Sequence, residues 1–254
     1  LLRIETGALQ DSTKSIRLET NGNVEIDGAG LNLDEADFTV DAAETVEINS
    51  AITATGATTI SIDSGDTFTL TTNGSLEAET ITLVSGNEAV VSGSANAVGT
   101  FSLTADAEIR QSGTIDSVDA IAVTSIGGAI LMSGDATTAS VTGAILYSAA
   151  GEMTVTSVVS TNGGDISLSS GAAITNVRGI VGTNVSTSGE VILTAVSGIG
   201  QIGNAIRVES GTLSLNNSGA TGDIVVTEST AGADLVISAL TQSATAGRSV
   251  LISE

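Results

Sequence analysis

Several amino acids are missing from this chain, and each absence removes a kind of chemistry. The 254 residues include no histidine, cysteine, proline or tryptophan. Without histidine and cysteine, a Ser-His-Asp or Cys-His nucleophile system, a thiolate site and a zinc site with the usual ligands are excluded. Disulfides are excluded as well. The absence of proline is consistent with sheets that need a backbone N–H at nearly every position.

Positive charge is also scarce. The chain has 7 Lys and Arg against 29 Asp and Glu, for a formal net charge of -22. Such a surface repels a phosphate backbone and an anionic membrane surface. The sequence contains no run of about 18 apolar residues, the length that crosses a bilayer as a helix. We therefore expect no nucleic-acid partner and no membrane insertion.

Aromatic residues make up only 2% of the chain, whereas 41% of the residues are hydrophobic. This is more apolar material than a disordered acidic chain carries, so we expect the chain to fold. The core must then be built from Val, Ile, Leu and Ala in many small layers rather than around large rings. This composition favours a repeat architecture.

Apolar and polar residues alternate in many short segments, such as 15–19, 37–41 and 59–63. Alternation with a period of two is typical of half-buried strands, and no segment of similar length has helical spacing. One apolar position recurs in ten steps of about 22 residues on average: Leu18, Val40, Ile62, Leu83, Leu103, Val123, Leu146, Leu168, Leu193, Leu215 and Ile237. We call these the anchor residues. A second apolar series runs beside them: Ile26, Ile48, Leu70, Val91, Ile109, Leu131, Val155 and Val226.

A period of about 22 residues, with two or three strands and glycine-containing turns, is typical of a solenoid whose coils stack. We predict an all-β, right-handed parallel β-helix of about eleven coils, with a core about 50 Å long. The longer anchor step from Leu168 to Leu193 predicts a loop around residues 178–184. A β-sandwich lacks such a column of anchors, a WD-type propeller needs about 40 residues per blade, and a porin-like barrel needs aromatic girdles.

Residues 1–254 are expected to form a single solenoid segment. The chain starts with Leu1-Leu2 rather than Met and ends with an apolar run at 250–252. We interpret it as a segment of a larger protein.

The acidic residues are concentrated in the first half, where 20 of the 29 lie within residues 1–120. Two sets recur at 22-residue intervals: Glu19, Asp41 and Asp63, and Glu44, Asp66 and Glu88. In a stack, each set would form a column of carboxylates about 5 Å apart, and Ca²⁺ would relieve their repulsion. The alternative is that water and salt screen them on the outer surface. The Gly-Gly-x-Gly-x-Asp repeats of calcium-binding β-rolls are missing.

An enzymatic interpretation has few residues available. Polysaccharide lyases with a β-helix use an Arg or Lys to abstract a proton, and here Arg110 and Arg178 are the candidates. The turns are too short for a substrate cleft, and the acidic surface would repel pectate. Catalysis is therefore the third hypothesis.

Four segments carry a resemblance to a known family: Gly163-Gly164-Asp165-Ile166-Ser167-Leu168, Ser188-Gly189-Glu190-Val191-Ile192-Leu193, Ser210-Gly211-Thr212-Leu213-Ser214-Leu215 and Gly222-Asp223-Ile224-Val225-Val226. They resemble the degenerate repeats of filamentous-haemagglutinin-like exoproteins and giant bacterial surface adhesins. The resemblance implies an extracellular or bacterial cell-surface protein whose β-helical shaft projects an adhesive region. Contacts with a host or neighbouring cell surface, or with a polysaccharide, would then be made by other parts of the parent protein.

These observations lead to one functional expectation and its alternatives. We expect a non-catalytic structural shaft or fibre-forming segment of an adhesin, able to associate end to end or laterally. The main alternative is a calcium-responsive or carbohydrate-binding module. No cofactor is expected other than calcium in that alternative.

Overall fold

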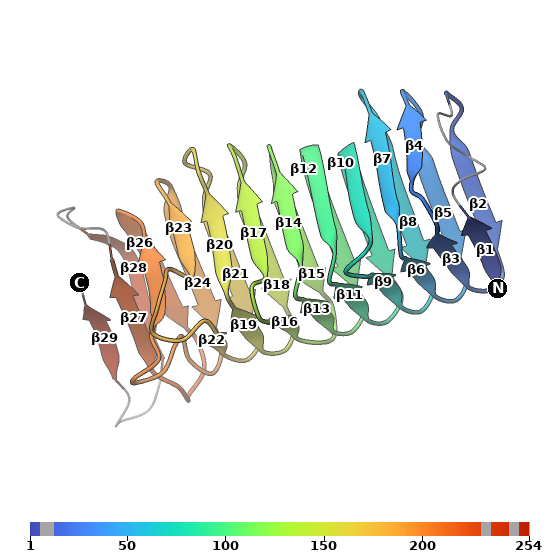
Figure 1. Cartoon of the computed structure of the whole chain (residues 1–254). Helices are drawn as coiled ribbons and strands as arrows, with labels where there is room; N and C mark the ends of the chain where they lie inside the picture. The colour runs from blue at the N-terminus through green and yellow to red at the C-terminus, as the bar shows by residue number, and fades with distance from the viewer. Residues whose placement is uncertain (6–12, 230–234, 244–248, 254) are drawn as a thin grey trace.

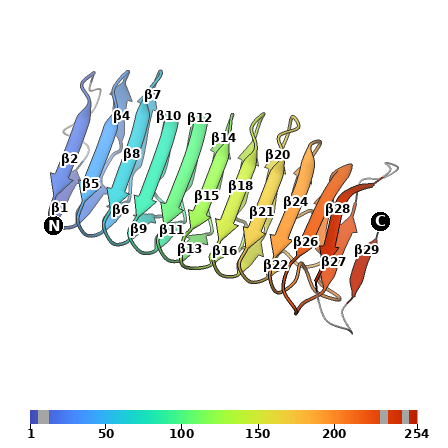
Figure 2. The same cartoon turned by 180° about the vertical axis from the view of Figure 1, so that it is seen from behind.

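The chain is an all-β solenoid of about 11 turns with roughly 22 residues per coil, as predicted. A computed structural model describes residues 1–5, 13–229, 235–243 and 249–253, and no helix occurs among them. The coils follow one another along one axis, from β1 at one end to β29 at the other (Figures 1 and 2). Every pairing between named strands is parallel.

Each regular coil contributes one strand to each of three sheets, which we call sheets I, II and III. Sheet I contains β2 (Ile16–Thr20), β5 (Phe38–Ala42), β8 (Thr59–Ser64), β15 (Ile121–Ser125), β18 (Ile145–Ala149), β21 (Ile166–Ser170), β24 (Glu190–Ala195), β26 (Thr212–Asn217) and β28 (Val236–Gln242). Sheet II contains β1 (Leu2–Glu5), β3 (Val24–Asp27), β6 (Val46–Ile48), β9 (Phe68–Leu70), β11 (Ala89–Val91), β13 (Ile109–Gln111), β16 (Ile130–Met132), β19 (Met153–Val155) and β22 (Ile174–Asn176). Sheet III contains β4 (Leu31–Asp34), β7 (Ala51–Thr55), β14 (Thr114–Ser117), β17 (Thr137–Ser140), β20 (Ser157–Ser160), β23 (Val185–Thr187), β25 (Ile206–Glu209), β27 (Ile224–Glu228) and β29 (Val250–Ser253). The long strands β10 (Ser75–Ser85) and β12 (Ser94–Ala105) run from sheet III into sheet I.

The anchor residues from Leu18 to Val123 form one column in sheet I, as predicted. At the next coil the prediction is wrong by one residue, because Val123 pairs with Tyr147 and not with Leu146. This register buries Ile145 and Tyr147 together, whereas Leu146 points outward and is 43% exposed. Burying two large side chains instead of one decides the register.

At the last anchor the prediction is also wrong. Ile237 pairs with Leu213, and an irregularity in the ladder then brings Leu240 opposite Leu215. An extra residue in one strand shifts every later partner, which periodicity alone does not reveal.

The second apolar series is confirmed for its first four members, Ile26 to Val91, which stack in sheet II. In the next coil Gln111, not Ile109, pairs with Val91, and Leu131 pairs with Arg110. Val226 lies in sheet III opposite Ile206. The coils vary in length, and Gln111 takes a column position, so apolar residues alone do not identify this column.

The interior is filled mainly by aliphatic side chains, and all three Phe residues and Tyr147 lie inside it. Hydroxyl groups occupy the inner corners. Ser64 Oγ donates to the carbonyl oxygens of Glu44 and Thr67, each at 2.9 Å, and Ser85 Oγ donates to Asp66 O at 2.7 Å and Glu88 O at 2.8 Å. Each buried hydroxyl is thus paired, and it lies between two turn carbonyls that also accept backbone hydrogen bonds.

The loop predicted around residues 178–184 is present between β22 and β23. The following coil carries a second loop at 199–205, where Gln201 and Asn204 form an antiparallel bridge. Both loops interrupt the regular path on neighbouring coils.

Candidate functional site

Glu19, Asp41 and Asp63 form a column on the outer face of sheet I, as predicted. Asp41 lies opposite Glu19 in β2 and β5, and Asp63 lies opposite Asp41 in β8. All three are exposed. Arg17 forms an ion pair with Glu19, and its guanidinium lies 4.0 Å from Asp41. The column ends there, since Val84 takes the next position.

The second predicted column is only partly formed. Glu44 and Asp66 lie in stacked turns, where Asp66 N donates to Glu44 O at 3.2 Å. In the following coil Asn87 lies next to Asp66, and its Nδ2 donates to Asp66 Oδ1 at 3.0 Å. Including Glu88 in this column was wrong, because the coil is one residue shorter than the period and Glu88 lies directly before β11 of sheet II. There its carbonyl accepts a hydrogen bond from Phe68 N at 3.0 Å.

Within the described ranges, no group of three or more carboxylates lies close enough together to hold a metal ion. Neighbours along a column are a coil apart, so two adjacent carboxylates could share a cation only with water completing its shell. Calcium binding at the two columns stays a prediction.

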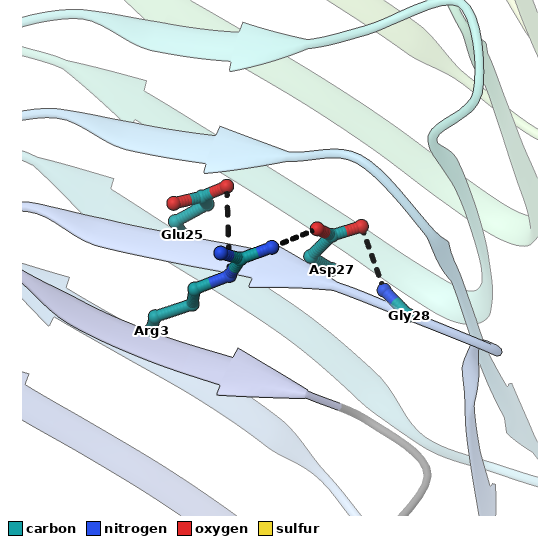
Figure 3. A network of polar contacts seen from close by, with 4 residues as sticks. All are labelled: Arg3, Glu25, Asp27 and Gly28. Atoms are coloured by element: carbon teal, nitrogen blue, oxygen red, sulfur yellow. Dashed lines mark hydrogen bonds and ion pairs between the residues drawn. The ribbon is translucent and has the colours of Figure 1, made fainter.

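A cluster of opposite charges links the first coils of sheet II (Figure 3). Arg3 Nη2 lies 2.5 Å from Asp27 Oδ2, and Arg3 Nε lies 3.9 Å from Glu25 Oε1. Gly28 N donates to Asp27 Oδ1 at 2.7 Å. The hydrogen bond from Arg3, and then that from Gly28, lower the pKa of Asp27. Because the cluster is exposed, we assign it a modest role in joining β1 to β3.

The two arginines considered for catalysis both have partners. Arg110 lies 2.6 Å from Glu88 and 2.5 Å from Glu108, so two carboxylates balance its charge. Arg178 Nη1 donates to Thr183 O at 2.9 Å, across the base of its own loop. Arg178 also lines a small cavity beside Asp135 and Thr137.

Three asparagines that the sequence analysis did not select hold the two loops together. Asn176 Nδ2 donates to Gly179 O at 2.8 Å and to Ala205 O at 2.9 Å, and thus touches both loops. Asn184 Nδ2 donates to Asn176 Oδ1 at 3.0 Å, and Asn204 Nδ2 donates to Asn176 O at 2.8 Å. A signal existed in the sequence, since Asn176 pairs with Val155 at a column position that holds apolar residues in the other coils, apart from Gln111.

The loops leave large apolar side chains in solvent. Ile180 and Val181 are each 76% exposed, and Ile202 is 70% exposed. Between the loops and sheet III lies a cavity of about 210 Å³ lined by Ile180, Asn204, Arg207, Val225, Thr227 and Leu251, among others. Here the described surface departs from a regular solenoid.

No helix in the described part of the chain is long and apolar enough to span a membrane. Comparisons with protein-family models, with curated proteins and with solved structures give no match. The class of protein is therefore set by the fold, which is that of a β-solenoid repeat protein. That fold suits a structural or a binding module.

Proposed function

We propose that this chain is a stiff structural shaft or fibre-forming segment of a large secreted or cell-surface bacterial adhesin, with no catalytic role. Adhesive contacts with a host or neighbouring cell surface, or with a polysaccharide, belong to other parts of the parent protein. End-to-end or lateral association of the rods is part of the proposal. The family resemblance of the Gly-Asp-Ile-type segments supports the extracellular location.

The observation that supports this role best is the continuity of the ladder. Sheet I is hydrogen-bonded without interruption from β2 to β28, and sheet III from β4 to β29. Each coil buries several aliphatic side chains, and each of these contributes roughly 1.5 to 3 kcal/mol. A force along the axis must separate whole coils, because each coil contacts only its neighbours.

Single-molecule stretching between the two ends tests whether the chain resists force along its axis as a shaft. We expect extension in steps that each release about one coil, near 22 residues. A single release of the whole chain at low force would contradict a shaft.

Adhesion and activity assays test whether this segment itself binds or cleaves anything. Beads coated with the isolated chain should not adhere to polysaccharide or to cells, and adhesion would assign binding to this segment itself. Release of unsaturated products from a polysaccharide, lost in Arg178→Ala, would overturn the non-catalytic assignment.

A calcium response is the second candidate function, favoured by the column of Glu19, Asp41 and Asp63. Millimolar Ca²⁺ should raise the melting temperature by several degrees, since a ligand at 100 times its Kd stabilises by about 2.7 kcal/mol. The combined variant Glu19→Gln, Asp41→Asn and Asp63→Asn should lose the shift, and the exposed Asp135→Asn is the control. An equal shift in the triple variant would eliminate this column as the site.

A further inference from the structure

The two loops form the main elaboration on the described part of the rod. In solenoids, insertions on neighbouring repeats commonly build the binding face. The loops at 177–184 and 199–205 lie on consecutive coils and are joined through Asn176. Asn184 is 1% exposed and also donates to Thr156 O at 3.0 Å, which fixes the first loop to the coil below. A site between such loops is preorganised, so binding costs little ordering entropy.

The cavity under these loops has aliphatic walls. Ile180 comes from the first loop, Val225 from the outer side of β27, and Leu251 from β29. Ile180 and Leu251 remain 76% and 49% exposed, whereas Val225 at the floor is 2% exposed. A ligand that covered Ile180 and Leu251 would remove apolar surface from water.

Arg207 lines the same cavity from β25 and lacks a charge partner. None of the ion pairs among the described residues involves it, and its buried Nε has no hydrogen-bond partner. Glu209, two residues along the same strand, accepts hydrogen bonds from Thr183 Oγ1 at 2.7 Å and from Ser186 Oγ at 3.2 Å instead. A guanidinium presents parallel N–H donors that match a carboxylate, so an arginine without a carboxylate partner beside a cavity offers a site for one.

We propose that this cavity binds a small carboxylate with a short aliphatic body, with Arg207 holding the carboxylate and Ile180 and Leu251 covering the body. A free short-chain acid and the carboxyl terminus of a peptide that ends in Val or Leu both offer this chemistry. The aromatic residues, three Phe and Tyr147, are all buried in the core. They cannot stack on a sugar ring, which disfavours a uronic acid.

The test is an NMR titration of the whole 254-residue chain, read on the methyl groups of Ile180 and Leu251. Isovalerate should shift both signals with a Kd in the millimolar range, as suits a ligand of few atoms. Isovaleramide, which is neutral and nearly the same shape, should bind about tenfold more weakly or worse. N-acetylvaline binding more tightly than isovalerate would indicate a peptide terminus, and the reverse order a free acid.

Variants separate this proposal from general anion attraction. Arg207→Gln should weaken isovalerate binding about tenfold or more, while Arg110→Gln, which alters an arginine far along the rod, should leave it unchanged. Ile180→Ala, at an exposed loop position that folding does not need, should also weaken binding. Circular dichroism confirms that each variant is folded. Unchanged affinity in Arg207→Gln, equal affinity for isovaleramide, or preference for glucuronate over isovalerate would overturn the proposal.

Discussion

Leu146 and Tyr147 are neighbours in β18 with opposite surroundings. Tyr147 is fully buried, and its hydroxyl lies 2.6 Å from Thr138 Oγ1 and donates to Gln111 Oε1 at 2.8 Å. Gln111 Nε2 in turn donates to Thr137 O at 2.9 Å. This buried network is fully paired, so it strengthens the register that places Tyr147 inside.

Paired substitutions test that register. Tyr147→Ala should destabilise the chain by about 3 to 5 kcal/mol because it leaves a cavity and breaks the network. Leu146→Ala should change stability by no more than about 0.5 kcal/mol, because Leu146 is an outward side chain. The measurement is the urea midpoint followed by circular dichroism. The opposite order would restore Leu146 as the anchor.

Tyr147 also predicts a response to alkaline pH. Burial raises the pKa of this phenol well above its ordinary value, and the hydrogen bond with Thr138 opposes the shift only in part. The folded state therefore keeps a proton that the unfolded state loses above a pH of about 10. The stability from this group is complete below that pH and falls as the pH rises beyond it.

Since Tyr147 is the only tyrosine, tyrosinate absorbance reports on it alone. We expect no tyrosinate signal in the folded protein above pH 10 until the circular dichroism signal of the strands is lost. Ionisation at about pH 10 with the strands intact would show that the phenol is accessible.

At the scale of the element, the turns that stack between sheets II and III explain many of the glycines. A Cβ on Gly93 would lie 2.1 Å from Gly74 O, and a Cβ on Gly113 would lie 1.9 Å from Gly93 O. Ser94 N and Thr114 N donate to the Gly74 and Gly93 carbonyls of the coil before, at 3.3 and 3.0 Å. Close stacking of turns thus needs glycine for space rather than for a positive φ.

Gly93→Ala should therefore destabilise the chain by at least about 1 to 3 kcal/mol, the usual cost of overpacking. The matched control is Gly211→Ala, because a Cβ there meets nothing within 4 Å. That variant should be neutral or slightly stabilising, by up to about 1 kcal/mol. Chemical denaturation of both variants gives the comparison, and equal midpoints would contradict the steric argument.

At the scale of the whole molecule, stability is a sum over coils and over the interfaces between them. Removing complete coils should therefore shorten the rod without unfolding it. Deletion of residues 40–82 joins Thr39 to Leu83, which lies two coils further along the anchor column. We expect a strand-rich circular dichroism spectrum and a maximum dimension about 10 Å shorter in small-angle X-ray scattering.

The control is a deletion that does not end in phase. Removal of residues 40–71 joins the middle of a sheet I strand to a turn, so the next strands meet the wrong sheets. This variant should lose cooperative unfolding and aggregate, because apolar faces and strand edges are exposed. If both deletions fold equally well, the coils are not interchangeable units.

The parallel β-solenoid and the average length of its coils could be predicted from the sequence alone. Alternation and the spacing of Leu, Ile and Val carry this information, because every coil must bury the same face on its neighbours. The loop at 178–184 and the column of Glu19, Asp41 and Asp63 were predictable for the same reason. These features depend only on distance along the chain.

The register where coils differ in length, as at Tyr147, Glu88 and Leu240, became clear only from the folded chain. A change of one residue reverses which side chains point inward, and the choice depends on how many large groups become buried and paired. The Asn176 network and the cavity at Arg207 were beyond prediction for a related reason. Their residues come from up to four coils, and contacts between coils are made by folding rather than by spacing.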